Sequence, residues 1–274
     1  MALEKIDTSK EEAYCKIALD YIEKYRKADV LVKVLDSENG KPIPNAKITY
    51  KQISHDFILS SVPWTNNAEG IRLRKELDLN CIGTYAFWRQ IEPEKGKFQF
   101  DSSYLAMEKF RASYPGTTFW VRISGTWPAS FSDYIGFQGL SDPPEWSHFR
   151  SASRSKEDFD EYKKEVYNFI FTLVSHYKGR GIIWLTQWEY NTVERFRYWG
   201  NKLDTSMRRA TVDEVVELAK VNAKAIRDAD PSALIVLDTS PTIGFGQVTS
   251  WRLDPSVYVE KSIAAEVDFD AIGW

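Results

Sequence analysis

Apolar residues along the chain follow two periodicities that alternate. Short runs rich in β-branched and aromatic residues predict six strands, over 57–62, 81–88, 117–124, 182–189, 233–240 and 269–274. Apolar positions at helical spacing lie between them, over 67–77, 102–113, 157–178, 212–229 and 256–265. Strands and helices that alternate in this way predict an α/β fold built on a parallel sheet.

A smaller element precedes this alternation. Apolar residues at helical spacing predict a helix over 10–27, and two β-rich runs, 29–36 and 46–53, predict strands after it. Asn39 and Gly40 lie between the two runs and are typical of a tight hairpin turn. We therefore expect an N-terminal domain with a helix and a β-hairpin or sandwich element.

The rest of the chain favours a TIM barrel over an open sheet. With the N-terminal domain at residues 1–55, the barrel domain covers 56–274, and no glycine-rich phosphate loop follows any of its strands. Its long loops follow strands, whereas short links such as 228–233 lead from helices back to strands. Barrel enzymes keep their sites in the loops at the carboxyl ends of strands. Because only six strands of a (β/α)8 barrel are found, we expect an incomplete barrel.

Composition and charge exclude several classes of function. The 274 residues carry 36 Lys and Arg against 39 Asp and Glu. A chain so near neutrality, with a pI of about 5.8, gives no reason to expect nucleic acid or an anionic membrane as partner. No apolar run is long enough for a membrane helix. Two cysteines and three histidines argue against a disulfide framework or a zinc cluster, so we expect no metal and no cofactor.

Glu189 is the most prominent polar residue at a predicted strand end. It ends a strongly apolar strand and lies between Trp188 and Tyr190. A carboxyl group among aromatic rings loses hydration, which favours its protonated form, as a general acid near neutral pH requires. The alternative is that Glu189 pairs with Arg89 or Arg122 and only closes the top of the barrel.

Tryptophan is unusually frequent, with 10 residues, and much of it falls at predicted strand ends or in the loops after them. Sugar rings offer flat faces that pack on indole, and their hydroxyls pair with amide, guanidinium and carboxylate groups. The alternative is that these aromatic residues form small cores for the long loops. The candidate substrate-binding residues are Trp88, Arg89, Trp127, Gln187, Trp188, Asn191 and Trp251.

Several segments resemble glycoside hydrolase family 10, the endo-β-1,4-xylanases. Residues 25–57 (YRKADVLVKVLDSENGKPIPNAKITYKQISHDF) resemble its N-terminal part and barrel entry. FWRQIEPEKGKFQFD resembles the second-strand signature that it shares with other retaining (β/α)8-barrel glycosidases, and VDFDAIGW is similar to its sixth strand. IIWLTQWEYN lies where the family has its acid/base glutamate. The resemblance implies that Glu189 is the acid/base of a retaining β-glycan hydrolase, with a β-linked oligo- or polysaccharide as substrate.

The sequence also departs from the family pattern. Trp188 stands where the family has asparagine before its acid/base glutamate, and the second-strand residues that hold xylose are not evident. The family's nucleophile follows strand seven, whereas this sequence ends at Trp274 on strand six. The resemblance therefore implies an N-terminal fragment, inactive by itself, whose nucleophile lies beyond residue 274. Asp238 is either a second carboxylate for an inverting mechanism or a hydrogen-bonding or ion-pairing residue.

Other interpretations stay open. A sugar-binding pseudoenzyme with the same fold would account for the departures before Glu189, and an unrelated barrel enzyme acting on a small metabolite would need a narrow pocket. Localisation is likewise divided. The resemblance implies secretion, while the N-terminal residues lack the apolar stretch of a secretory signal and predict a cytoplasmic protein.

Overall fold

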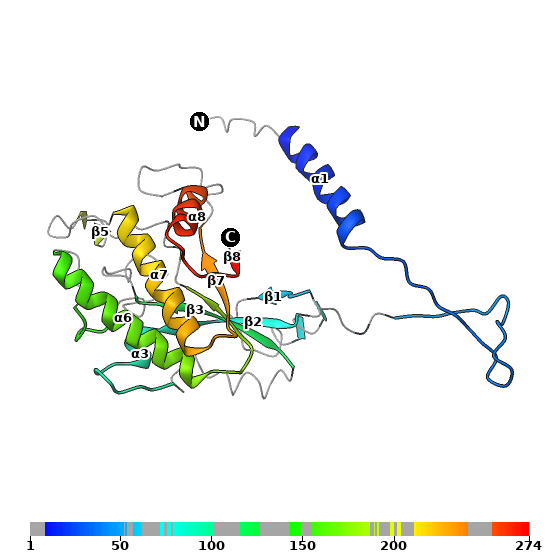
Figure 1. The fold of residues 1–274 in the computed structure, drawn as a ribbon, viewed down its shortest axis with the longest axis horizontal. Helices are drawn as coiled ribbons and strands as arrows, with labels where there is room; N and C mark the ends of the chain where they lie inside the picture. Colours follow the sequence, from blue (N-terminus) through cyan, green and yellow to red (C-terminus); the bar gives the residue numbers. More distant parts are fainter. Residues whose placement is uncertain are drawn as a thin grey trace. The chain divides into compact units, whose positions relative to one another are not determined.

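The computed structural model divides the chain into two compact units, Met1–Asp56 and Phe57–Trp274 (Figure 1). The structure describes residues 9–51, 53, 57–61, 72–73, 76–77, 79–100, 116–126, 143–148, 155–186, 189, 191, 198–199, 202–203, 211–240 and 254–273.

The N-terminal unit begins with the predicted helix, α1, Ser9–Tyr25. Gly40 adopts a left-handed conformation with φ +66°, as the turn at this position requires. In the described part of this unit, the expected pairing of two strands is reduced to one isolated antiparallel bridge, between Leu35 and Pro42. Val30 and Leu31 are 83% and 80% exposed. A two-stranded hairpin that buries so little apolar surface is marginally stable in water, which accounts for the missing ladder.

The second unit is built on a six-stranded sheet with the order β1-β2-β3-β4-β7-β8, in which each neighbouring pair is parallel. The strands are β1 (Ser60–Ser61), β2 (Cys81–Phe87), β3 (Thr118–Ser124), β4 (Ile182–Leu185), β7 (Leu234–Asp238) and β8 (Ala271–Gly273). Each lies within one of the six predicted segments, so the parallel α/β prediction is confirmed. A separate antiparallel pair, β5 (Tyr198–Trp199) and β6 (Lys202–Leu203), was not expected.

Helices lie between the strands of this unit in the described part of the chain. They are α3 (Trp88–Ile91), α6 (Lys156–His176), α7 (Val212–Ala229) and α8 (Pro255–Ala264). Thr211 and Glu214 form a capping box at the start of α7. The helix expected over 102–113 and most of the one expected over 67–77 lie outside the described residues. In the part of the chain that the structure describes, no helix has the length and hydropathy to cross a membrane.

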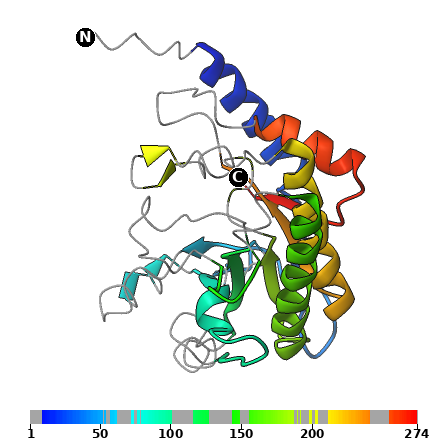
Figure 2. The same cartoon turned by 90° about the vertical axis from the view of Figure 1, so that its left-hand side faces the viewer.

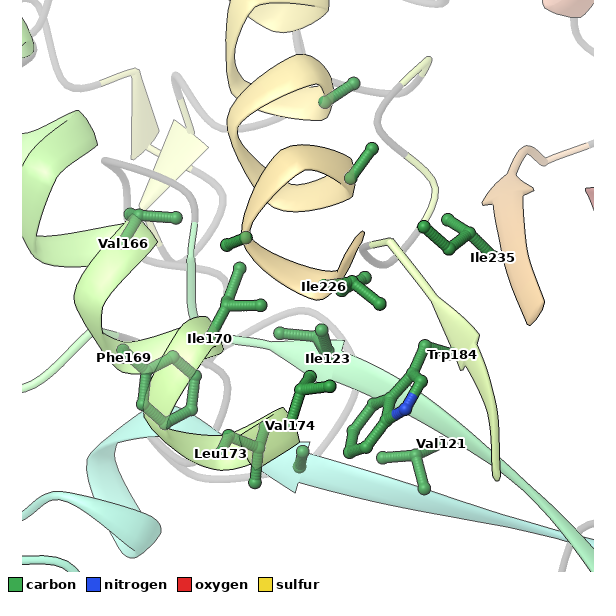
Figure 3. Close-up of a cluster of buried hydrophobic side chains, with 14 of the residues drawn as sticks. Val121, Ile123, Val166, Phe169, Ile170, Leu173, Val174, Trp184, Ile226 and Ile235 are labelled. Atoms are coloured by element: carbon green, nitrogen blue, oxygen red, sulfur yellow. The ribbon is translucent and has the colours of Figure 1, made fainter. Parts of the chain in front are cut away.

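The main core lies between one face of the sheet and helices α6 and α7, which run side by side (Figure 2). Figure 3 shows side chains of the strands and the two helices meeting in this layer, and all of those it labels are buried. They are Val121, Ile123, Val166, Phe169, Ile170, Leu173, Val174, Trp184, Ile226 and Ile235. Because side chains alternate along a strand, Trp120 and Arg122 of β3 point to the opposite face.

Gly83 and Trp120 fit together on that opposite face. They are register partners on β2 and β3, and the Trp120 indole covers the glycine so closely that an added Cβ would lie 1.9 Å from its Cζ2 atom. The indole Nε1 donates a hydrogen bond to Ser60 Oγ of β1 at 2.5 Å. Gly83 thus lets one ring bridge three adjacent strands.

We predict that Gly83→Ala lowers the free energy of unfolding by about 1–3 kcal/mol, since overpacking forces the indole or the strands to shift. The same substitution in a Trp120→Val background should cost much less, because the smaller side chain leaves room for the methyl group. Urea unfolding of the four proteins measures both costs. An equal cost in the two backgrounds would contradict the steric explanation.

Candidate active site

Neighbouring strands bring polar side chains together on the face opposite to α6 and α7. Tyr85 is on β2, Arg122 on β3 and Asp238 at the end of β7, and Glu189 follows β4. Tyr85 and Arg122 are register partners. Because the strands are parallel, these residues meet at one edge of the sheet, the carboxyl edge, where barrel enzymes carry their sites.

Arg122 and Asp238 form a two-point ion pair across the end of β4. Arg122 Nη2 donates to Asp238 Oδ1 at 3.2 Å, and Arg122 Nε lies 3.1 Å from Oδ2. The side chains are 18% and 3% exposed. The guanidinium also lies near the rings of Tyr85 and Trp120, 6.0 and 5.7 Å from their centroids. One hydrogen bond and one further ion-pair contact thus confirm the ion-pairing interpretation of Asp238.

The surroundings of Asp238 change its affinity for protons. Burial raises the pKa of its carboxyl to about 6, although Arg122 and the Glu189 backbone N–H both act to lower it. The negative charge of Glu189 acts in the raising direction, on Asp238 and also on the pKa of the buried Tyr85 phenol. The two carboxyl groups therefore sense one another electrostatically.

Glu189 has an unusual backbone conformation. Its φ of +49° lies in the left-handed region, which costs a non-glycine residue roughly 1–2 kcal/mol. Its backbone N–H donates a hydrogen bond to Asp238 Oδ2 at 3.2 Å. The Asp238 side chain on β7 thus supports the strained backbone of Glu189, which follows β4.

Asn191 ties the same loop to β7 a second time. Its Nδ2 donates to the Ser240 carbonyl at 2.9 Å, and its Oδ1 accepts from the Ser240 N–H at 2.8 Å. The Asn191 side chain is fully buried. Both ends of its amide are therefore engaged with the backbone that follows β7.

A second buried network lies at the end of β2. The Trp88 side chain is 0% exposed, stacks on Phe169 of α6 and meets Trp146 edge to face. Its Nε1 donates to Glu92 Oε2 at 2.8 Å, and the Gly96 N–H donates to Glu92 Oε1 at 2.8 Å. Burial raises the pKa of the Glu92 carboxyl, while these two bonds lower it. This burial leaves the Trp88 ring no surface for a sugar.

Glu165 of α6 extends this network. It accepts from the His148 N–H at 2.8 Å, lies 2.8 Å from His148 Nδ1, and pairs with Lys95 at 3.3 Å. Trp146 Nε1 donates to the Glu92 carbonyl at 3.0 Å. The segment 143–148 is thereby held against both the β2 end and α6. The sequence pattern does not single out Glu92, although its spacing of four residues from Trp88 is the one expected for side chains that meet on a helical turn.

The structure places half of the sequence-predicted site residues. Glu189 and Asn191 lie at the carboxyl edge beside Asp238, and Trp88 is in the core. Arg89 pairs with Glu145 at 2.6 Å and donates to the Pro143 carbonyl, while the ion pair of Arg122 is with Asp238. The residues that lie outside the described part of the chain are Trp127, Gln187, Trp188 and Trp251. Within the described residues, no group of three or more His, Cys, Asp or Glu could hold a metal ion.

Comparisons with known proteins place this arrangement in a barrel fold. No family model matches the chain. β-Galactosidase 8 of Arabidopsis thaliana is 31% identical over 107 residues, which are 39% of this chain and 12% of that protein. A thermostable mutant of the xylanase Xyn10A from Cellvibrio japonicus has a TM-score of 0.51 at 16% identity, over 80% of this chain and 59% of that one.

A β-galactosidase from Halorubrum lacusprofundi has a TM-score of 0.47 at 15% identity, over 79% of this chain and 39% of that one. The chain thus spans less than two thirds of each of these proteins. The parallel sheet with helices between its strands, together with the likeness to Xyn10A, shows the predicted fold: an incomplete (β/α)8 TIM barrel.

The pKa of Asp238 predicts a pH-dependent stability. The folded state binds this proton more tightly than the unfolded chain, whose aspartates titrate near 3.9. The resulting stabilisation is present below pH 4 and is lost as the pH rises through about 6. From pH 4 to 7, wild type should therefore lose up to about 3 kcal/mol relative to Asp238→Asn, which cannot titrate.

Urea unfolding at several pH values measures this difference. Asp230 serves as the control, because the Ser232 hydroxyl lowers the pKa of its carboxyl. The advantage of wild type over Asp230→Asn should instead disappear as the pH falls below 4. A difference between wild type and Asp238→Asn that stays constant from pH 4 to 7 would contradict the assignment.

Proposed function

We propose that this chain forms part of a retaining β-glycan hydrolase in which Glu189 is the general acid/base. The observation that carries the proposal is the position of Glu189. It follows the fourth strand of the sheet at the carboxyl edge, beside Tyr85 and Asp238. This is where a barrel enzyme presents a carboxyl group to a bound substrate.

The proposed chemistry follows from this placement. Glu189 protonates the glycosidic oxygen as the bond to the leaving sugar breaks, and then removes a proton from the water that completes hydrolysis. Asp238 is not suited to attack a sugar or activate a water, because both of its oxygens are engaged by Arg122 and the Glu189 N–H. We assign no nucleophile among the described residues.

The names of the relatives support the reaction class. One is a β-galactosidase and another a xylanase, and both kinds of enzyme hydrolyse β-linked sugars. We propose a β-linked oligo- or polysaccharide as substrate, with Trp127, Gln187, Trp188 and Trp251 as sugar contacts. The sequence around Glu189 favours a second candidate, a sugar-binding protein without catalysis, because Trp188 replaces the asparagine of the family pattern.

The test uses the complete protein of which this chain forms part. It compares wild type with Glu189→Gln on aryl β-galactosides, β-xylosides and β-glucosides and on unactivated xylo- and gluco-oligosaccharides. General acid–base catalysis contributes roughly 10²–10⁴-fold. We expect a loss of kcat/KM in that range on oligosaccharides, and a smaller loss on aryl glycosides whose leaving groups need little protonation. Glu94→Gln is the matched control, since Glu94 is exposed and pairs with Lys97.

Two outcomes would contradict the hydrolase. If Glu189→Gln keeps more than a tenth of the wild-type kcat/KM on oligosaccharides, Glu189 is not the acid/base. If wild type shows no turnover but binds oligosaccharides in calorimetry, the protein is the non-catalytic sugar-binding candidate. Absence of both turnover and binding would favour an unrelated barrel enzyme.

A further inference from the structure

The left-handed conformation of Glu189 raises the question of what maintains it. Such a conformation persists in a non-glycine residue only where the surroundings hold it, and residues held in this way are concentrated at functional sites. The backbone dihedral also sets the direction in which the Glu189 side chain leaves the loop. Whatever fixes the backbone of this residue therefore aims its carboxylate.

One side chain contacts that backbone from another strand. Asp238 Oδ2 accepts the Glu189 N–H at 3.2 Å, and the same carboxylate is held from the other side by Arg122. β4 lies between β3 and β7 in the sheet, so the Arg122–Asp238 pair spans the end of the strand from which the Glu189 loop leaves. The chain of contacts runs from β3 through β7 to Glu189.

The loop is attached to β7 at Asn191 as well as at Glu189, so the contact between Asp238 and Glu189 can be removed without detaching the loop. Its two hydrogen bonds to the Ser240 backbone secure the loop two residues after Glu189. Loss of the Asp238 carboxylate would therefore release the orientation of Glu189 while the loop stays attached to β7. A substitution at Asp238 therefore tests the orientation of the Glu189 side chain alone.

We propose that Asp238 is the positioning residue of Glu189: its carboxylate, fixed by Arg122, accepts the Glu189 N–H and holds the Glu189 side chain toward the substrate. This inference rests on the function proposed for Glu189, and it adds a residue that acts through Glu189 without touching the sugar.

The first experiment is a double-mutant cycle on kcat/KM with Asp238→Ala and Glu189→Gln in the complete protein. Displacement of a reacting group by about 1 Å can cost roughly 10²-fold. We expect Asp238→Ala to lower kcat by about that factor with KM changed less than threefold, and Asp238→Asn, which keeps one acceptor oxygen, to recover part of the rate. In the Glu189→Gln background the cost of Asp238→Ala should fall below threefold, because residues that act as a unit are not additive.

Asp230→Asn controls for lost stability. Asp230 is also a buried carboxylate, but it binds Ser232 and the Gly179 N–H, before β7 and after α6. The Asp230→Asn substitution should lower the free energy of unfolding and leave kcat/KM unchanged. Equal costs of Asp238→Ala in the wild-type and Glu189→Gln backgrounds would overturn the positioning role.

A second experiment does not depend on activity. In ¹⁵N–¹H NMR spectra of wild type, the Glu189 amide shift should contain a pH-dependent component with a midpoint near the pKa of Asp238, about 6, and this component should be absent in Asp238→Asn. Arg122, Tyr85 and the Glu189 carboxyl face Asp238 from β3, β2 and the loop after β4. They are unaltered in both proteins, so any pH response that they cause is common to both. A Glu189 amide that ignores pH in wild type would overturn the contact. If the Glu189 amide responds to pH as expected but the protein shows no turnover, the result counts against the proposed hydrolase and not against the contact with Asp238.

Discussion

The arrangement of the site depends on a buried ion pair that crosses one strand. Arg122 and Asp238 belong to strands that are not neighbours, and their ion pair links these strands above the end of β4. Such a pair adds little net stability, yet loss of one partner leaves a buried charge that costs roughly 3–5 kcal/mol. The role of the pair is thus to set the geometry of the site, because the Glu189 N–H donates a hydrogen bond to it.

The two faces of the sheet divide stability from chemistry. Apolar side chains of β3, β4 and β7 pack under α6 and α7 and remove a large apolar surface from water. Trp120, Arg122 and Asp238 occupy alternate positions of these strands, and their side chains lie on the other face. Since the core fixes the strands without involving that face, polar residues can be buried there as long as they satisfy one another. Glu92 and Glu165 follow the same rule at the end of β2.

The sequence predicts the parts of this molecule that local physics determines. The six strands and helices α6 and α7 follow from apolar periodicity and caps such as Thr211, because these patterns span only a few residues. The N-terminal hairpin did not form a ladder, since strand pairing needs a surface to cover it. The sequence offered Arg122 only as one alternative partner of Glu189, whereas the ion pair of Arg122 with Asp238 joins residues 116 positions apart in the chain. The burial of Glu92 depends on Trp146, equally beyond local patterns.

The bonding between Asn191 and Ser240 has an evolutionary consequence. Asn191 uses its side-chain amide, whereas Ser240 contributes only its main-chain N–H and carbonyl. Any residue other than proline supplies the same two groups, so drift at position 240 is permitted while position 191 is constrained to a side chain that both donates and accepts. Related sequences should therefore keep the residue at position 191 and vary at position 240. The two positions should show no covariation even though the contact is retained.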